Sequence, residues 1–370
     1  MKILVTGGAG FIGSHTVDRL LSRGHSVRIL DSLEKPVHEL GKPAWLNPQA
    51  EFLLGDVTRR EDWLRALSGI DAVYHLAAYQ DYLPDFSKFF RVNAMGTALL
   101  YEVVVEERLP VRKVVVASSQ AVYGEGRHRC PEGHESWPDM RPEEQLRAGR
   151  FEVRCPACGR ETRWQPSDVP GANPQNPYGL SKHAQEQIAL QLGRRYGIPS
   201  VAMRYSIVQG PRQSFTNAYS GACRVFCLSL HVGREPPIYE DGQQVRDFVN
   251  IHDAVDANLL VLEDPRADHR AFNVGGGRAL TVLEFAGIVA RVFGREIAPR
   301  PGGRYRFGDT RHIFSDVSEL RKLGWEPRRS AEESVREYVA WLREYRDVED
   351  ILSRAEAQMK ALGVLREVVA

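Results

Sequence analysis

The sequence has almost no net charge and no long apolar run. Its 49 basic and 48 acidic side chains leave a formal charge of +1, without the basic excess that a general nucleic-acid binder usually carries. No apolar stretch approaches the ~20 residues that a membrane-spanning helix needs. The first residues read as a strand and lack the apolar region and cleavage site of a signal peptide. We therefore expect a cytoplasmic protein that binds neither nucleic acid nor a membrane.

Cysteine is also scarce, with 5 residues in a chain of 370. In the cytoplasm these thiols should be reduced or metal-bound rather than paired in disulfides. Internal repeats and low-complexity tracts are lacking too. Hydrophobic residues make up 43% of the chain, which is enough to bury the core of one large α/β domain or two modest ones.

The first 205 residues alternate short apolar runs with amphipathic stretches. Continuous runs of Val, Ile and Leu separated by helices indicate a parallel sheet that is covered on both faces. The pattern predicts an α/β fold, a Rossmann-type doubly wound parallel sheet. Expected strands cover 2–6, 27–30, 51–54, 72–76, 113–117 and 201–205, and expected helices cover 11–23, 89–107 and a stretch from about Tyr178.

The rest of the chain is expected to form smaller units. Residues 206–330 have shorter elements and predict a C-terminal substrate lobe, and a return of part of this stretch to the Rossmann sheet stays open. Residues 331–370 are charged and helical in pattern, which predicts a tail of surface helices. Residues 126–172 are rich in Arg, Glu, Pro and Gly, carry three cysteines, and read as an insertion between a strand and a helix.

A glycine-rich segment directly follows the first expected strand and opens the first helix. It fits G-x-G-x-x-G from Gly8 to Gly13, and equally G-x-x-G-x-x-G from Gly7 to Gly13. Glycines permit a tight turn and the close approach of a pyrophosphate to the helix N-terminus. Asp31, at the end of the second strand, would accept hydrogen bonds from the ribose and repel a 2′-phosphate. The pattern therefore favours NAD over NADP.

Two further strand ends face the expected cofactor. Asp56 and Val57 follow the third strand, where an adenine contact would fall, and Asp56 fits a helix cap equally well. Small residues after His75 would let the cofactor lie flat against the backbone. His75 itself reads better as a buried structural histidine than as a catalytic residue.

Tyr178 and Lys182 lie one helical turn apart, so their side chains fall on one face of the helix. A phenol with a pKa near 10 is a poor base at neutral pH, but a nearby ammonium and the positive nicotinamide ring would favour the phenolate. Such a tyrosine could take a proton from a hydroxyl while NAD⁺ takes the hydride from the same carbon. Ser119 would hydrogen-bond the reacting oxygen. Taken alone, the Tyr/Lys spacing also fits an ordinary amphipathic helix.

These motifs together resemble the extended short-chain dehydrogenase/reductases of the nucleotide-sugar epimerase/dehydratase group. The resemblance covers residues 1 to about 330 apart from the insertion. It implies that Ser119, Tyr178 and Lys182 are catalytic and that the protein forms a homodimer through the helix after the fourth strand and the Tyr178 helix. It rests on TGGAGFIG (6–13), Asp31, HLAA (75–78), RVNAMGT (91–97), SSQAVYG (118–124), NPYGLSK (176–182), VRDF (245–248) and HDA (252–254).

The resemblance also assigns ligand contacts. Asn93 should lie near the nicotinamide ribose and Arg246 should hold the diphosphate of a nucleotide sugar. Arg306 and Asp309 resemble a late nucleotide-contacting pair, with a solvated ion pair as the alternative. The expected NAD contacts are Gly7, Gly10, Phe11, Ile12, Gly13, Asp31, Asp56, Val57, Ala77, Asn93, Ser118, Tyr178 and Lys182. The expected substrate contacts are Ser119, Gln120, Tyr178, Asn217, Arg246, Arg306 and Asp309.

The residues after Ser119 bear on the type of reaction. Family 4,6-dehydratases carry an acidic pair there, but this chain has Gln120 and Ala121, neither of which can act as an acid. This favours C4 epimerisation through a 4-keto sugar, in which NAD is regenerated in each turnover and stays tightly bound. A net oxidoreductase or decarboxylase on the same class of substrate, and a non-catalytic dinucleotide-sensing binder, are the alternatives.

The insertion carries a candidate metal site. Cys155 and Cys158 form a knuckle that aims two thiolates at one ion, and Cys130 with His134 could complete a tetrahedral zinc shell. His128 is a rival ligand, and reduced loop cysteines are the alternative to a structural zinc. Cys223 and Cys227 lie one turn apart on an apolar helix and read as buried small hydrophobes.

Two features narrow the expected substrate. The Cys-rich insertion and Ser206-Ile207 resemble bacterial dTDP-L-rhamnose 4-epimerases, which implies dTDP-L-rhamnose or a related 6-deoxyhexose. Another nucleotide sugar, such as a UDP-hexose, a GDP-sugar or an ADP-heptose, stays open. Residues 78–82 are expected to form a second wall of the sugar pocket, with a surface loop as the alternative.

Overall fold

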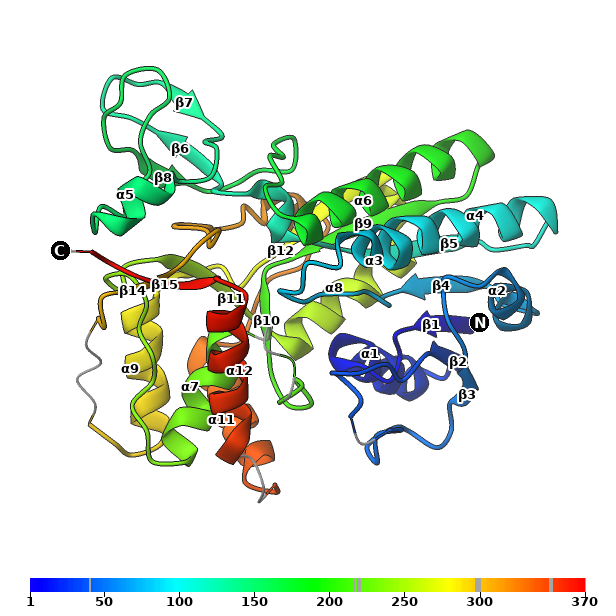
Figure 1. Ribbon diagram of the computed structural model, residues 1–370. Coiled ribbons are helices and arrows are strands. Elements are labelled where there is room, and N and C mark those ends of the chain that lie inside the picture. The colour runs from blue at the N-terminus through cyan, green and yellow to red at the C-terminus, as the bar shows by residue number, and fades with distance from the viewer. Residues whose placement is uncertain (40, 216, 218–220, 297–300, 346–348, 370) are drawn as a thin grey trace.

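A computed structural model describes residues 1–370 except 40, 216, 218–220, 297–300, 346–348 and 370 (Figure 1). Its central sheet has seven strands in the order β12-β9-β5-β4-β1-β2-β3, and every neighbouring pair is parallel. Strand order reverses between β1 and β4, which opens a crevice at the carboxyl ends of the strands. The strands are β1 (Lys2–Thr6), β2 (Ser26–Asp31), β3 (Glu51–Leu54), β4 (Ala72–His75), β5 (Lys113–Ser119), β9 (Ser200–Tyr205) and β12 (Arg270–Val274).

Helices cover both faces of this sheet, and each face has its own apolar core. Successive strand residues alternate between the two cores: Ile3 and Val5 pack on one side and Leu4 on the other. This confirms the predicted Rossmann-type sheet. The first face is covered by α1 (Phe11–Ser22), α8 (Ile251–Glu263) and α10 (Ser318–Lys322), and the second by α2 (Arg60–Leu67), α4 (Gly96–Glu106) and α6 (Pro177–Tyr196).

Local sequence features explain where α6, the helix that carries Tyr178, begins and ends. The Asn176 side chain accepts a hydrogen bond from the Gly179 N–H at 2.7 Å, and Pro177 occupies the first helical position. The helix ends at Gly197, whose φ of 67° is the left-handed conformation that favours glycine. The helix expected over 89–107 is instead three consecutive pieces: α3 (Phe86–Phe89), the π-helical η1 (Phe90–Met95) and α4.

A second lobe packs beside the carboxyl edge of the sheet. Its sheet has the order β10-β11-β13. The predicted division left open a return of the 206–330 stretch to the central sheet, and β12 makes that return. The C-terminal stretch differs from the prediction of a surface tail, since Val335 and Tyr338 are fully buried. The lobe comprises β10 (Ile207–Gln209), α7 (Ala222–His231), β11 (Val245–Asn250), β13 (Ala279–Thr281), α9 (Val282–Val292), β14 (Arg304–Arg306), α11 (Ala331–Leu342), α12 (Glu349–Ala361) and β15 (Leu365–Glu367).

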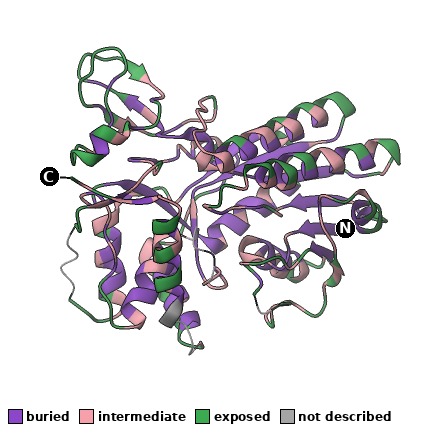
Figure 2. Ribbon diagram, viewed as in Figure 1, coloured by how far each residue is buried: buried purple, intermediate pink, exposed green. Residues whose placement is uncertain are grey.

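The predicted insertion forms a small projecting unit of its own, at the top of Figure 1. Its three strands are antiparallel in the order β7-β6-β8, and much of its outer surface is exposed (Figure 2). No helix within the described residues is long and apolar enough to cross a bilayer. The remaining elements are η2 (Gln120–Tyr123), β6 (Arg127–Arg129), β7 (Glu135–Ser136), α5 (Glu143–Arg147), β8 (Arg163–Gln165) and η3 (Pro265–Ala267).

Candidate active site

A cavity of about 940 Å³ opens at the carboxyl ends of the parallel strands. It runs from the first strand-to-helix turn to β14 and α12, so both lobes line it. Its size is at the upper end of the roughly 300–1,000 Å³ typical of ligand pockets. All of the predicted cofactor and substrate residues except Asn93 line this one cavity.

The glycine turn faces the cavity through Gly7, Gly10 and Gly13. A Cβ atom at Gly13 would lie 2.1 Å from the Gly7 carbonyl oxygen, and one at Gly7 would lie 2.7 Å from the Ala77 nitrogen. Gly8 faces the Ile29 side chain instead. The glycines that line the cavity therefore follow the G-x-x-G-x-x-G spacing. The turn leaves no room for a side chain at Gly7 or Gly13.

Asp31 is buried at the rim of this turn with its carboxylate held in place. One oxygen accepts the Ala9 N–H and the other accepts the Leu33 N–H, each at 2.9 Å. His38 Nε2 lies 3.7 Å from the same carboxylate. Burial lowers the pKa of His38. The sequence analysis missed His38, because no motif connects it to Asp31.

Asp56 lies at the cavity and is not the N-cap of α2, which is Arg59. Its carboxylate accepts the Thr58 N–H at 2.8 Å in the turn before α2.

Asn93 is the one predicted cofactor residue that does not line the cavity. It is fully buried behind the cavity wall, and its amide is bonded to protein groups: the oxygen accepts the Tyr79 N–H at 2.8 Å, and the nitrogen donates to the Tyr79 carbonyl and to Ser181 Oγ. Its side chain fixes residue 79 against α6. Asn93 therefore positions the cavity wall next to residue 79, and a contact with the nicotinamide ribose stays a prediction.

His75 is a structural residue, as predicted. Its side chain is fully buried, and its ring nitrogens lie 2.8 Å from Thr6 Oγ1 and 3.0 Å from Thr97 Oγ1. Burial lowers its pKa to about 3, so the ring is neutral at physiological pH.

Ser119, Tyr178 and Lys182 come together at the middle of the cavity. A hydrogen bond joins Ser119 and Tyr178. Lys182 Nζ donates to the Ala117 carbonyl and to Gln185 Oε1, both at 2.8 Å, and lies 5.9 Å from the centre of the Tyr178 ring. Gln185, which the sequence analysis missed, sits at the i+3 position and orients the ammonium.

The electrostatics of this group differ from the prediction. Burial raises the pKa of Tyr178 to about 12, although the Ser119 hydrogen bond acts in the opposite direction. Burial also lowers the pKa of Lys182 to about 7. Burial therefore outweighs the Ser119 hydrogen bond and disfavours the phenolate. The positive nicotinamide ring is the remaining source of stabilisation.

Two arginines line the far end of the cavity. Arg246 donates to the Thr310 and Arg311 carbonyls at 2.7 and 3.0 Å. Arg306 pairs with Asp309 at 2.5 Å and also donates to the Tyr82 hydroxyl at 3.0 Å. Arg306 and Asp309 are about one-quarter exposed and face the cavity, so the alternative of a solvated surface pair does not apply.

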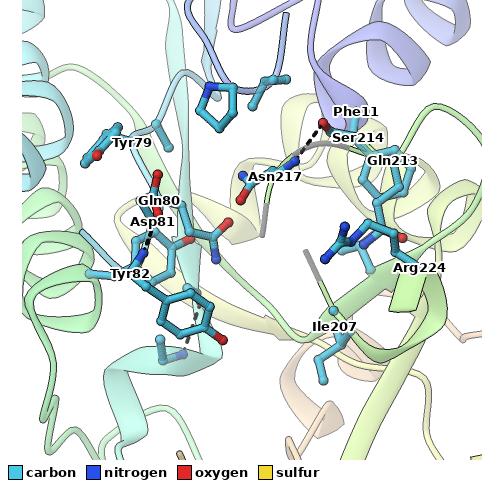
Figure 3. A pocket seen from close by; sticks show the side chains of 18 of the residues that line it. Phe11, Tyr79, Gln80, Asp81, Tyr82, Ile207, Gln213, Ser214, Asn217 and Arg224 are labelled. Atoms are coloured by element: carbon cyan, nitrogen blue, oxygen red, sulfur yellow. Dashed lines mark hydrogen bonds between the residues drawn. The ribbon is translucent and has the colours of Figure 1, made fainter. Parts of the chain in front are cut away.

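The walls between these ends are polar (Figure 3). Gln80, Asp81 and Tyr82 lie on one side, and Asn217 and Arg224 lie on the other. The 78–82 stretch therefore forms a wall of the cavity, as predicted. Within the described part of the chain, three buried amide oxygens that line the cavity have no hydrogen-bond partner, which suits a ligand rich in hydroxyl groups. They belong to Gln120, Gln213 and Gln244.

The C-terminal segment contributes lining that the sequence analysis missed. Leu352, Ala355 and Met359 of α12 and Val364 reach the cavity. Arg304 of β14 pairs with Glu356 at 2.8 Å, which fixes α12 against that strand. The charged helical pattern of residues 331–370 does not indicate that this segment reaches the cavity.

The predicted metal ligands also meet, in the inserted unit. The ligand atoms of Cys130, His134, Cys155 and Cys158 all lie within 4.8 Å of one another. The Cys130–Cys158 sulfur distance is 3.7 Å, and the Cys130–His134 S···N distance is 3.5 Å. A tetrahedron with Zn–S of about 2.3 Å has edges of about 3.8 Å. The four residues therefore fit a zinc ion.

The rival metal ligand is already engaged. His128 has one ring nitrogen 2.8 Å from Thr162 Oγ1 and the other 3.0 Å from the Glu125 carbonyl oxygen. The N–H groups of Cys158 and Ala157 lower the pKa of the Cys155 thiol to about 6, as a metal-binding knuckle requires. Cys223 and Cys227 are fully buried in α7, as predicted.

This fold and this arrangement define a dinucleotide-dependent enzyme of the Rossmann type. The chain belongs to the NAD dependent epimerase/dehydratase family, whose sequence profile matches residues 3–145 and 157–275. It is 34% identical over 354 residues to a dTDP-L-rhamnose 4-epimerase from Burkholderia thailandensis, with 92% of this chain and 94% of the relative covered.

Solved structures agree with this assignment. The UDP-glucose 4-epimerase of Thermotoga maritima with UDP-glucose is 30% identical, with a TM-score of 0.75, and the match covers 93% of this chain and 99% of that one. A dTDP-glucose 4,6-dehydratase from Streptomyces venezuelae with NAD bound is 27% identical, with a TM-score of 0.74, and the match covers 95% and 100%. The shared fold therefore spans both reaction types of the family.

Proposed function

We propose that this protein is an NAD-dependent 4-epimerase of a nucleotide-diphosphate sugar. The observation that carries the proposal is the position of Ser119, Tyr178 and Lys182 in one cavity, between the glycine turn and the two arginines. A nucleotide sugar bound by its diphosphate at Arg246 and Arg306 would present its ring to Tyr178. The relatives with 4-epimerase names support the same reaction.

The residues around the glycine turn fit NAD. Backbone N–H groups at the start of α1 would bind the pyrophosphate, because Gly7, Gly10 and Gly13 line the cavity without side chains that would keep a phosphate away from the backbone. Asp31 would accept the ribose hydroxyls. When bound, NAD supplies a hydride acceptor that returns the hydride within the same turnover.

The protein side chains would control the proton at the reacting oxygen. Tyr178 takes the C4 hydroxyl proton as the C4 hydrogen leaves, and Ser119 bonds the same oxygen. Lys182 would hold its side-chain nitrogen near the phenol, with Gln185 and the Ala117 carbonyl fixing its position. The 4-keto sugar would then turn over while its diphosphate stays anchored at the two arginines, which would present the opposite face of C4 to the cofactor.

Epimerisation is favoured over dehydration by the residues next to Ser119. Elimination of water needs an acid at this place, but Gln120 carries an amide and Ala121 a methyl group. For the sugar, dTDP-L-rhamnose or a related 6-deoxyhexose is the preferred substrate, supported by the relative of that name, which matches over nearly its whole length. UDP-hexoses, GDP-sugars and ADP-heptoses are the alternatives.

The test is incubation with a panel of dTDP-, UDP-, GDP- and ADP-sugars, with NMR analysis of the products. Inversion at C4 is the expected result. Tyr178→Phe should keep NAD and lower turnover by about 10²–10⁴-fold. Tyr196→Phe is the matched control, because Tyr196 is exposed at the far end of the same helix. Release of NADH, or accumulation of a keto sugar, would instead identify an oxidoreductase or decarboxylase.

The cysteine cluster supports a second proposal, a structural zinc ion held by Cys130, His134, Cys155 and Cys158. The ligand spacing and the low pKa of the Cys155 thiol support it. The zinc would close the inserted unit, which has few strands and little core of its own. Unpaired thiols in this arrangement also support the placement in the cytoplasm.

We also propose that the protein is a homodimer. Phe90 and Met95 of η1 and Leu180 of α6 each expose at least 40% of their surface. These two elements pack side by side, so the exposed apolar side chains belong to one region of the surface. Large exposed apolar groups in one region mark association sites.

A further inference from the structure

A cluster of buried charges lies outside the cavity, between the inserted unit and the substrate lobe. Arg141 of the insertion pairs with Glu125 at 2.9 Å and with both carboxylate oxygens of Glu240, at 2.9 and 3.1 Å. Arg311 shares Glu240 at 3.0 Å. All four side chains are at most 2% exposed.

Stabilisation of the fold does not explain why these four charged side chains are buried together. Desolvation of buried ion pairs offsets most of their attraction, and apolar residues of similar volume often stabilise a protein as well or better. Glu240 also has a φ of 52°, a left-handed conformation that costs a non-glycine residue energy and persists only where the surroundings hold it. The cluster therefore fixes a geometry.

The buried cluster fixes the backbone path of residues 309–311. From the side of the insertion, Arg141 donates to the Asp309 carbonyl at 2.7 Å and Glu125 accepts the Arg311 N–H at 2.6 Å. From the side of the cavity, the Thr310 and Arg311 carbonyls hold the Arg246 guanidinium. The segment is thus clamped between the buried cluster and the arginine that faces the ligand.

A second link leads from the metal cluster to the same segment. Glu152 lies three residues before Cys155, and its carboxylate bonds Arg311 at 2.5 Å and His312 at 3.0 Å. The family profile leaves residues 146–156 unmatched. Glu152 therefore supports this segment from the unmatched part of the insertion, whereas Arg141 lies within the matched part.

We propose that Arg141 is a positioning residue for the substrate diphosphate. It holds residues 309–311 where their carbonyls aim Arg246 into the cavity, so the inserted unit sets the affinity for the nucleotide sugar without touching it. This inference rests on the proposed function, in which Arg246 binds the diphosphate. It assigns the insertion a role in substrate binding and none in cofactor binding or proton transfer.

The test compares Arg141→Lys with the wild-type protein. Lysine keeps the charge but loses the forked contacts to Glu240 and Asp309. We expect the KM for the sugar nucleotide and the Kd for dTDP or UDP, measured by calorimetry, to rise about tenfold. The kcat at saturation should stay within about twofold, and the NAD content should not change.

Two further variants separate positioning from folding. Arg329→Met removes an ion pair with the buried Asp253, 2.6 Å away and outside the cavity, so it should lower the melting temperature without moving KM. Arg141→Met combined with Glu125→Gln and Glu240→Gln avoids uncompensated buried carboxylates at both positions, and should reproduce the rise in KM.

The outcomes are distinct. If Arg141→Lys melts at a lower temperature but binds dTDP and UDP as tightly as the wild type, Arg141 only stabilises the fold and the inference is wrong. A fall in kcat at constant KM overturns it as well. A wild-type protein that binds neither nucleotide and converts no sugar would instead overturn the proposed function, and this inference with it.

Discussion

At the scale of single residues, the cofactor end of the cavity depends on the absence of side chains. Gly13 opens α1 with its Cα close to the Gly7 carbonyl, and a Cβ would also lie 2.8 Å from the Gly8 Cα. These neighbours are backbone atoms, which cannot rotate away. The turn therefore tolerates glycine alone at this position.

Gly13→Ala should consequently push the start of α1 away from the glycine turn, because the new methyl group would clash with the Gly7 backbone. We expect a loss of about 1–3 kcal/mol in the free energy of unfolding, as for other overpacked sites, and purified protein with little bound NAD. Denaturant titration and absorbance of the released cofactor measure both effects. The matched control is Gly287→Ala inside α9, where the nearest atom is 3.9 Å away.

The control should behave in the opposite way. Alanine is the better helix former, so Gly287→Ala should raise stability by about 0.5–1 kcal/mol and leave the NAD content unchanged. Equal loss of stability in the two variants would contradict the steric argument for Gly13.

Residues that belong to a recognisable motif could be predicted from the sequence. Residues that only contact or orient the motif residues could not. The glycines, Asp31, Ser119, Tyr178 and Lys182 follow from spacing and strand ends, and all line the cavity. The hydrogen-bond partners of Asn93 could not be predicted, because a motif gives no information on which way an amide points. His38 was missed because its contact with Asp31 depends on the path of the loop after β2. Gln185 was missed because its contact with Lys182 depends on the desolvation of the lysine side chain.

At the scale of elements, the insertion shows what composition can and cannot predict. The three cysteines and the Arg/Glu-rich stretch indicated a unit interrupting the sheet, and the structure has its own small sheet there. The choice of His134 over His128 could not be made from spacing. It follows from the buried partners of His128, which occupy both ring nitrogens.

The zinc proposal makes a prediction at this scale. Protein purified without metal affinity should contain about one equivalent of zinc per chain, and Cys158→Ser should lose most of it and melt at a lower temperature, because structural zinc contributes folding energy. Elemental analysis and thermal unfolding measure this. Cys223→Ser is the control, since Cys223 is a buried helix residue 3.9 Å from Cys227. It should keep its zinc, and metal-free wild-type protein would contradict the proposal.

At the scale of the whole molecule, the parallel sheet was predictable and the division into lobes was less so. Apolar runs of four to seven residues specify central strands by themselves. The return of β12 to the sheet and the burial of α11 depend on long-range packing, which local periodicity does not encode. The cavity therefore includes α12, although its sequence resembles a surface helix.

Association can be tested at the same scale. Met95→Glu combined with Leu180→Glu places charges on the exposed region of η1 and α6, and should halve the mass measured by light scattering. Leu54→Glu, at the exposed end of β3 at the sheet edge, should leave the mass unchanged. A wild-type protein that is monomeric at micromolar concentration would contradict the dimer.

The antiparallel pairing of β15 with β14 bears on the order in which the protein is made. Every residue that we assign to the cofactor lies at or before residue 182, so the ribosome delivers all of them before it reaches β14 and β15. Arg306 lies on β14, which receives its strand partner from residues 365–367. A nascent chain thus carries the dinucleotide residues long before its sugar-nucleotide wall is complete, and a transcript that ends early yields a chain with the first and without the second.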